Sequence, residues 1–302
     1  MAKKKDIISS IKRFKNKKNA VILAHNFQLK EVHDIADFIG DSIEMCRQAK
    51  DSSANILLVC GARFMAEMVK ISSPKKRVLL ANRRIRCPLA ESINVKRLKA
   101  LQKRHPMAIT VSFIASPAKV KAESDLCVSA SSAIDDIKKI DDEKEIIFIP
   151  DKYLADYVKK KTKRKIIPYT GYCPMHVSIC AKNIIAMKKD NLDADILIHP
   201  QCTPDLIELA DKVLSSSMMA ENISKSDKNN FIVASDSEFI ELIKKKNPKK
   251  TILAASNVAE CKALKRVGLR RILDTLRFES NKIKLSSDTI KKASSALEGL
   301  RI

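Results

Sequence analysis

The sequence predicts an α/β protein built from three similar small parallel-sheet domains around a pseudo-threefold axis. Two observations support this fold class. Short runs of apolar residues alternate with amphipathic segments of about ten residues, as in parallel sheets whose buried strands are connected by helices. The pattern also recurs about every 87 residues. Units of that length bury too little surface to be stable far apart, so the three copies are expected to pack together.

Residues of the same type mark matching points in each copy. Aspartates occur 88 and then 86 residues apart, at Asp37, Asp125 and Asp211. Cysteines occur 86 and then 88 residues apart, at Cys87, Cys173 and Cys261. Three cysteines in register with the other markers are not expected by chance, and the repeat therefore predicts that they have a shared role.

Each copy is expected to contain the same elements in the same order. A first strand is predicted at residues 20–24, 108–113 and 194–199. A polar turn before a helix is predicted at residues 40–42, 129–131 and 215–217. A second strand is predicted at residues 56–59, 146–149 and 231–234, followed by a helix at residues 62–70, 151–161 and 236–246. A third strand is predicted at residues 77–81, 165–169 and 251–255. The last of these helices is expected to begin with a capping box formed by Ser235 and Glu238.

The ends of the chain add helices to this core. An amphipathic helix is predicted near residues 7–14, and a helical tail follows the third copy. The predicted organisation is an N-terminal helix (1–19), a first repeat (20–104), a second repeat (105–190), a third repeat (191–268) and a C-terminal helical tail (269–302).

Composition excludes several classes of protein. Hydrophobic residues make up 45% of the 302 residues, too many for a disordered polyelectrolyte. The longest stretch without a charged residue, 166–181, is too short and too rich in proline to span a membrane. The five glycines are too widely spaced for a dinucleotide-binding or Walker A loop. Since the basic N-terminus has no apolar signal-peptide core, a cytoplasmic location with reduced or metal-bound cysteines is expected.

The net charge of +23 comes from basic runs spread along the whole chain. Aromatic residues are only 4% of the sequence, and no zinc-finger or RNA-binding motif is present. A solvated, lysine-rich surface whose field attracts small anions is the preferred interpretation, and nucleic acid is not expected as a partner.

The three in-register cysteines predict an iron–sulfur cluster. Cys87, Cys173 and Cys261 can converge on the threefold axis and would leave one iron without a protein ligand. A structural zinc site normally has four ligands and local Cys-x-x-Cys pairs, and no such pair occurs here. An iron with an open coordination position can act as a Lewis acid.

Polar residues at the predicted strand ends are candidates for binding and catalysis. His25 and His199 occupy equivalent positions after the first strands, where open parallel sheets bind ligands, and His176 follows Cys173 by three residues. These histidines are expected to act as acid–base or hydrogen-bonding groups. The polar turns can bind anions or simply cap helices. They contribute the substrate-binding candidates Asp41, Ser42, Ser129 and Ser216.

From about Ala20 to Leu273 the sequence resembles the quinolinate synthases, iron–sulfur enzymes of NAD biosynthesis. The resemblance is carried by ILAHNFQ (22–28), DIADFIGDS (34–42), FMAEMVKISSPKKRVLL (64–80), CPLA (87–90), KAESD (121–125), PDKYLADYV (150–158), GYCPMH (171–176) and HPQCTP (199–204). It implies a [4Fe-4S] cluster on Cys87, Cys173 and Cys261. It also implies condensation of iminoaspartate with dihydroxyacetone phosphate to quinolinate, after an L-aspartate oxidase or dehydrogenase has supplied the iminoaspartate.

The resemblance also defines where this chain differs from the family. His25, Ser42, His176 and His199 match pocket positions, and Ser216 keeps the hydroxyl of the usual threonine. The differences are Phe27 for tyrosine, Phe113 and Ala115 for tyrosine and asparagine, Ala130 for serine, and Gln201 for glutamate. Gln201 is expected to bind substrate as a neutral amide.

These differences fall in the organic-substrate pocket and leave the cluster ligands intact. One alternative is therefore a diverged relative that keeps the cluster and acts on another small anionic substrate. The other is a non-enzymatic protein that binds nucleic acid through its basic surface and contains the cluster as a structural or redox element.

Overall fold

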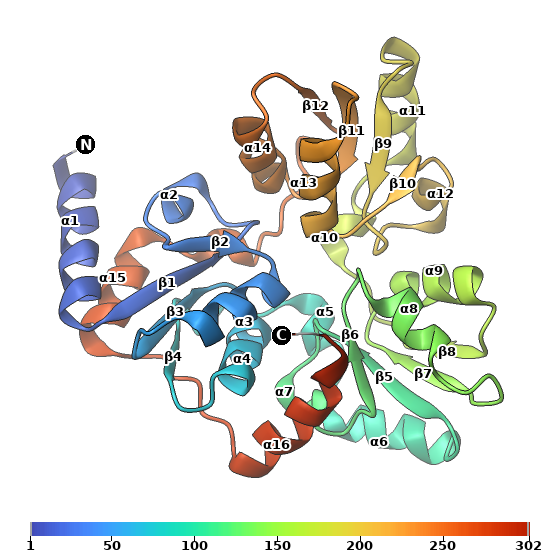
Figure 1. The fold of residues 1–302 in the computed structure, drawn as a ribbon, viewed down its shortest axis with the longest axis horizontal. Helices are drawn as coiled ribbons and strands as arrows, with labels where there is room; N and C mark the ends of the chain where they lie inside the picture. Colours follow the sequence, from blue (N-terminus) through green and yellow to red (C-terminus); the bar gives the residue numbers. More distant parts are fainter. Residues whose placement is uncertain (1, 301) are drawn as a thin grey trace.

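The computed structural model describes residues 2–300 and 302 and contains three separate four-stranded parallel sheets, which confirms the predicted fold class (Figure 1). The first sheet consists of β1 (Ala20–His25), β2 (Phe38–Gly40), β3 (Ile56–Cys60) and β4 (Arg77–Leu80). The second consists of β5 (Ile109–Phe113), β6 (Leu126–Val128), β7 (Ile146–Ile149) and β8 (Ile166–Pro168). The third consists of β9 (Asp195–Ile198), β10 (Lys212–Val213), β11 (Asn230–Ala234) and β12 (Thr251–Ala254).

All three sheets have the same strand order. The orders are β2-β1-β3-β4, β6-β5-β7-β8 and β10-β9-β11-β12, so one edge strand, one central pair and one further edge strand recur in each copy. The central strands are almost completely buried, which explains their continuous apolar sequence. The edge strands β2, β6 and β10 have only two or three residues, too few to give a periodic sequence signal, and were not predicted.

Helices recur in the same order as well. A short helix follows the first strand of each copy: α2 (Lys30–His33), α7 (Ala118–Lys121) and α12 (Pro204–Ile207). The polar turns lead into α3 (Ser42–Asp51), α8 (Ala133–Lys138) and α13 (Ser216–Lys225). The next helices are α4 (Arg63–Ser72), α9 (Lys152–Thr162) and α14 (Ser237–Lys246). Short turns follow the cysteines as α5 (Pro88–Glu91), α10 (Pro174–Val177) and the 3-10 helix η1 (Leu264–Arg266). Each copy then continues into α6 (Val95–Arg104), α11 (Ala181–Asp190) or α15 (Leu269–Phe278).

The in-register aspartates make the same hydrogen bond in every copy. The side chain of Asp37 accepts from the backbone N–H of Ile22 at 2.8 Å. Asp125 accepts from Thr110 at 2.7 Å, and Asp211 accepts from Ile196 at 2.8 Å. Each carboxylate thereby ties the segment before an edge strand to the adjacent first strand. The periodicity of these aspartates is therefore structural.

The predicted capping box at the start of α14 is wrong. Asp236, not Ser235, is the N-cap, and its carboxylate accepts from the backbone N–H of Glu238 at 3.0 Å. Among the described residues, the buried hydroxyl of Ser235 has no hydrogen-bond partner. A carboxylate can accept several hydrogen bonds at once, and Asp236 also binds Lys265 and the backbone of Cys261. A true capping box occurs at α3, between Asp41 and Glu44.

The two ends of the chain pack against the repeats. Helix α1 (Ala2–Lys17) packs against α15 and buries Ile11 (Figure 1). The chain after α15 then forms an antiparallel bridge between Lys282 and Leu79 beside β4. Helix α16 (Ser287–Ala296) packs on α4 and α7, and η2 (Glu298–Leu300) packs on β6. The C-terminal segment thus contacts both the first and the second repeat.

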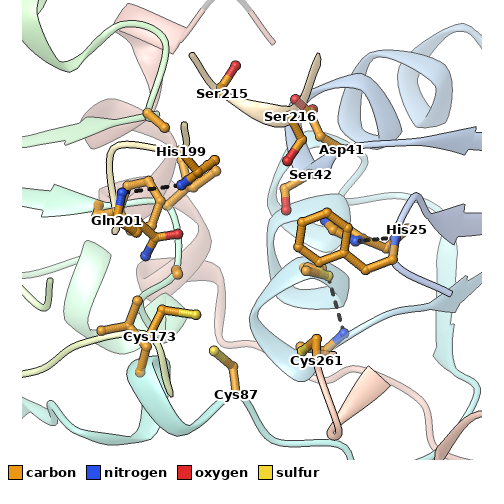
Figure 2. A pocket seen from close by; sticks show the side chains of 18 of the residues that line it. His25, Asp41, Ser42, Cys87, Cys173, His199, Gln201, Ser215, Ser216 and Cys261 are labelled. Atoms are coloured by element: carbon orange, nitrogen blue, oxygen red, sulfur yellow. Dashed lines mark hydrogen bonds between the residues drawn. The ribbon is translucent and has the colours of Figure 1, made fainter. Parts of the chain in front are cut away.

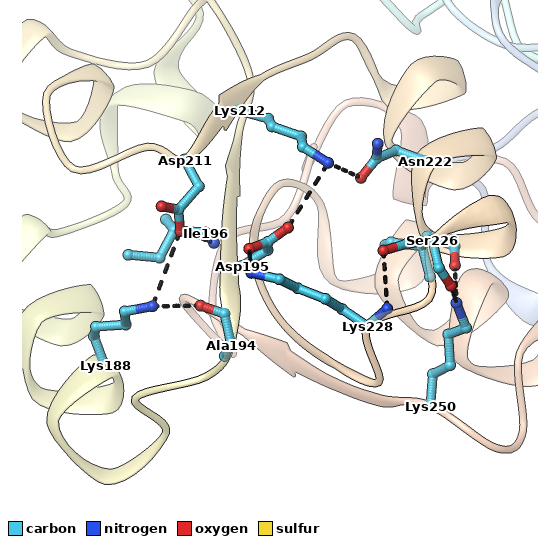
Figure 3. Close-up of polar contacts among 11 residues, drawn as sticks. Lys188, Ala194, Asp195, Ile196, Asp211, Lys212, Asn222, Ser226, Lys228 and Lys250 are labelled. Atoms are coloured by element: carbon cyan, nitrogen blue, oxygen red, sulfur yellow. Dashed lines mark hydrogen bonds and ion pairs between the residues drawn. The ribbon is translucent and has the colours of Figure 1, made fainter.

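Lysines pair with a buried and an exposed aspartate near β9. The largely buried carboxylate of Asp195 is paired with Lys212 at 3.7 Å and with Lys228 (Figure 3). Lys188 donates to the carbonyl of Ala194 at 2.6 Å and lies 4.0 Å from Asp211. Part of the excess positive charge therefore has a structural role. Across the described residues, no helix combines the length and hydropathy needed to cross a membrane.

Candidate active site

A cavity of about 130 Å³ lies where the carboxyl ends of the three sheets meet. Its lining comes from all three repeats, although the contributing residues are far apart in sequence (Figure 2). All the predicted site residues line this one cavity: His25, Asp41, Ser42, Cys87, Ser129, Cys173, His176, His199, Gln201, Ser216 and Cys261. The threefold repeat thus brings these residues together, while their individual roles stay predictions.

The three cysteines occupy equivalent local structures. Cys87 and Cys173 are the N-caps of α5 and α10, each followed by a proline in the first turn, and Cys261 precedes η1. Backbone N–H groups of the turn after each cysteine act on its thiol and favour the thiolate. Figure 2 shows the three side chains directed into the same part of the cavity from three separate segments.

The donor set of the three thiols is compatible with an iron–sulfur cluster. Burial raises the pKa of Cys87 to about 12 and also raises the pKa values of Cys173 and Cys261, and the three groups interact electrostatically. Metal binding must therefore displace protons from them. Within residues 2–300 and 302, no three His, Cys, Asp or Glu side chains are close enough to hold one metal ion. Three thiolates that line the same cavity and are approached by backbone N–H groups are a suitable ligand set for an iron–sulfur cluster.

His25 and His199 are held in the same tautomer. The backbone N–H of Phe27 donates to Nδ1 of His25 at 3.1 Å, and that of Gln201 donates to Nδ1 of His199 at 3.3 Å. Each ring therefore carries its proton on Nε2. Burial lowers the pKa of both histidines to about 3, with His33 and Lys265 adding to the effect at His25. Near neutral pH they are uncharged hydrogen-bond donors.

His176 is a buried histidine whose hydrogen-bonding capacity is unused. Its ring stacks on that of His199 with centroids 4.2 Å apart and an interplanar angle of 11°. It is 2% exposed, and neither ring nitrogen has a hydrogen-bond partner among the described residues. Burial, reinforced by His199, lowers its pKa well below the usual range. Buried polar atoms are normally paired, so these nitrogens point to a ligand in the cavity.

The polar turns of all three repeats contribute hydroxyl groups to the cavity lining. Ser42 and Ser216 are the buried first residues of α3 and α13, whose N-caps are Asp41 and Ser215. In the second repeat the equivalent of Ser42 is Ala130, and Ser129 forms a hydrogen bond with Ser131 at 2.8 Å. Capping and anion binding are compatible here, since the side chains of Ser42 and Ser216 do not serve as the caps.

The second repeat supplies an apolar wall. Phe113 replaces the histidine that the first and third repeats carry, and Ala115 and Ala130 are neighbouring small residues. Ile114 also lines the cavity from this side. The cavity is therefore asymmetric: hydrogen-bonding groups come mainly from repeats one and three.

Two buried aspartates next to the cavity were not predicted as site residues. Asp236 accepts from the backbone N–H of Cys261 at 2.7 Å and from Lys265 at 2.9 Å, and Lys265 also donates to the carbonyl of Phe27 at 2.7 Å. Asp151 accepts from the side-chain amide of Gln201 at 2.5 Å. Burial raises the pKa of Asp151 to about 6, so it is mostly ionised at neutral pH and above. Their signal in the sequence was that both begin the helix after the second strand of a repeat, 85 residues apart.

A third buried residue supports the cavity wall. Lys121, which is completely buried, donates to the carbonyl of Ile114 at 2.7 Å and also to that of Ser116. The segment 114–116 contributes two lining residues, so Lys121 fixes part of the apolar wall. A charged residue in a short helix gives no signal of burial in a single sequence.

The chain is similar in sequence to known proteins over nearly its whole length. The family profile described as "Quinolinate synthetase A protein" matches residues 9–300. "Quinolinate synthase 1" of Methanosarcina acetivorans is 38% identical over 293 residues, covering 97% of this chain and 96% of that protein. The "Quinolinate synthase" of Sulfurihydrogenibium sp. is 37% identical and covers 97% of both chains. That of Aquifex aeolicus is 37% identical, covering 97% of this chain and 93% of its own.

Proposed function

Because the chain belongs to the quinolinate synthase family, a family of enzymes of NAD biosynthesis, we propose that it condenses iminoaspartate with dihydroxyacetone phosphate to quinolinate. Phosphate and water would be released. The main support from the structure is the convergence of three cysteines, three histidines and several hydroxyl groups on one cavity between the repeats. Iminoaspartate would come from an L-aspartate oxidase or dehydrogenase. The reaction would take place in the cytoplasm, where thiols stay reduced.

Cys87, Cys173 and Cys261 are the residues that would hold a [4Fe-4S] cluster in this proposal. When bound, the cluster would supply one open iron as a Lewis acid that favours the loss of a hydroxyl group as water. Support for this ligand set is that the three cysteines are partly buried, line the same cavity and are approached by backbone N–H groups.

The histidines would bind and orient the substrates. His25 and His199 can each donate from Nε2 to a carboxylate or carbonyl oxygen without carrying charge. His176 has a donor and an acceptor nitrogen unused, so it is the residue best suited to move a proton between ligand atoms. Ser42, Ser129 and Ser216, with Asp41 at the head of α3, would complete the binding site.

The apolar wall favours a second candidate function. Phe113, Ile114, Ala115 and Ala130 offer no side-chain hydrogen bond to a ligand. A relative that uses the same cluster on another small anion, with an apolar group facing the second repeat, would fit this wall.

The test is to measure iron, sulfide and quinolinate formation on anaerobically purified protein. Cluster with quinolinate formation from the two substrates is the expected result. Replacing Cys87 with serine should abolish cluster absorbance and turnover, whereas the exposed Cys180→Ser should keep both. Cluster without turnover would contradict quinolinate synthesis and favour the second candidate. Protein that binds no cluster even after reconstitution would contradict the three-cysteine assignment.

A further inference from the structure

The carboxylate of Asp151 joins two repeats beside the cavity. It lies in the second repeat, is completely buried, and caps α9 by accepting from the backbone N–H groups of Tyr153 and Leu154, both at 3.0 Å, through Oδ1. Its other oxygen, Oδ2, accepts from Nε2 of Gln201 in the third repeat at 2.5 Å. Gln201 is itself buried and lines the cavity.

This contact fixes which end of the Gln201 amide faces a ligand. An ionised carboxylate only accepts hydrogen bonds, so the amide must turn its NH₂ group toward Asp151. The amide oxygen Oε1 is then directed to the other side, and Figure 2 shows it on the side of the cavity. The main chain cannot easily rotate away, because the backbone N–H of Gln201 donates to His199 at 3.3 Å.

We propose that Asp151 is a positioning residue that makes Gln201 a fixed hydrogen-bond acceptor, which selects ligands carrying an N–H donor at that point. The inference rests on the proposed function only in taking this cavity as the ligand site. A neutral acceptor is well suited to an anionic ligand, because it binds a donor group without adding a negative charge. His25 and His199, by contrast, present donors to the cavity.

The equivalent positions in the other repeats lack a hydrogen bond like that between Asp151 and Gln201. In the first repeat the residue matching Gln201 is Phe27, whose carbonyl is bound by Lys265 next to Asp236. In the second repeat the matching residue is Ala115, and the position matching Asp151 in the first repeat is Ala62. Of the three equivalent interfaces, the one between repeats two and three is therefore the one where an aspartate orients a side-chain amide and so exposes its oxygen as an acceptor. A ligand would be oriented with its donor group toward this interface.

The experiment compares two four-carbon dicarboxylates as probes on cluster-loaded protein at pH 8. L-aspartate carries an ammonium donor, and succinate is the same chain without it. Wild-type protein is expected to bind L-aspartate about tenfold more tightly than succinate. The reason is that bound succinate would leave the amide oxygen of Gln201 without a hydrogen-bond donor. Isothermal titration gives both dissociation constants.

Two variants separate orientation from charge. In Asp151→Asn the Oδ1 cap can remain, but the new NH₂ group must donate to Oε1 of Gln201, so the amide turns its own NH₂ toward the cavity. Gln201→Met keeps the Asp151 charge and removes the acceptor. Both variants should reduce the aspartate-to-succinate ratio by about tenfold. The exposed Asp156→Asn on the same helix should leave the ratio unchanged.

The results that would overturn the role of Asp151 differ from those that would overturn the proposed reaction. An unchanged ratio in either Asp151→Asn or Gln201→Met, equal binding of the probes by wild type, or binding of neither probe would overturn this inference. Quinolinate formation combined with an unchanged ratio would overturn this inference alone. A ratio that follows the variants without quinolinate formation would leave it standing and overturn the proposed reaction.

Discussion

His25 and His199 are held in one tautomer by their own backbones. In each case the N–H of the residue two positions later donates to Nδ1, so that the proton resides on Nε2. The cavity is thus supplied with neutral donors, which can bind an anion over a wide pH range because their charge does not change near neutral pH. The chemistry of the two residues is set by a local turn that occurs twice.

A buried neutral histidine makes stability depend on pH. Burial lowers the pKa of His25 to about 3, whereas an unfolded histidine titrates near 6.5. Between these values the unfolded chain binds more protons, so the free energy of unfolding falls as the pH falls from about 6.5 toward 3. His25 alone should lower it by about 2 kcal/mol between pH 7 and pH 5.

The measurement is urea unfolding of wild type and His25→Gln at both pH values, in the same state of metal loading. Between pH 7 and pH 5, the free energy of unfolding should fall by about 2 kcal/mol less in the variant than in wild type. His105→Gln, at a partly exposed position, is the control and should behave as wild type. Equal losses in wild type and His25→Gln would contradict the neutral, buried state.

At the scale of the element, each in-register aspartate links an edge strand to its sheet through a hydrogen bond. Each accepts from one backbone N–H of the first strand at 2.7–2.8 Å. Edge strands of two or three residues have few ladder hydrogen bonds of their own, so a side-chain bond of this kind matters. The recurrence also explains why the spacing of these residues was visible in the sequence.

Replacing Asp125 with asparagine should lower the free energy of unfolding by about 1–3 kcal/mol. The reason is that a charge-assisted hydrogen bond to the buried N–H of Thr110 is weakened. Urea unfolding with an unchanged m-value is the appropriate measurement. The exposed Asp51→Asn serves as the control, and a loss no larger than that of the control would show that Asp125 does not hold the strand.

A single sequence could predict some of these elements and residues but not others. The central strands, the helices after them and the in-register cysteines were predicted, because apolar runs and repeats report burial directly. The edge strands were not predicted, and the cap of α14 was assigned to Ser235 instead of Asp236. Asp151, Asp236 and Lys121 were also missed. The two aspartates bind groups in other segments that only the folded chain brings near. For Lys121 the reason is that a charged residue in a short helix gives no sign of its burial.

At the scale of the whole molecule, three sheets that do not share strands surround one cavity. Side chains and the C-terminal segment connect the repeats. Glu67 of α4 accepts from the backbone N–H of Ala118 at 2.8 Å, between repeats one and two. Helix α16 packs on both α4 and α7 and buries Ala293 and Ala296. The C-terminal segment therefore stabilises the interface that carries part of the apolar wall.

Ala293→Glu should disturb this interface. It would place a charge at a completely buried position, which should cost at least about 3 kcal/mol in the free energy of unfolding. The exposed Ser294→Glu on the same helix adds the same charge and should change it by about 0.5 kcal/mol or less. Chemical unfolding of both variants provides the comparison, and similar values would indicate that α16 is not docked on the repeats.

The sequence by itself determined the class of fold, the threefold repeat and the register of the three cysteines, because burial pattern and periodicity are properties of the linear chain. It also determined the family. Only the tertiary structure decided that the predicted site residues share one cavity, that His176 has no hydrogen-bond partner among the described residues, and that Gln201 donates to Asp151 beside that cavity. The physical reason is that each of these properties depends on contacts between repeats. Such contacts join residues tens of positions apart, and no local pattern in the sequence specifies which hydrogen-bond partner they will meet.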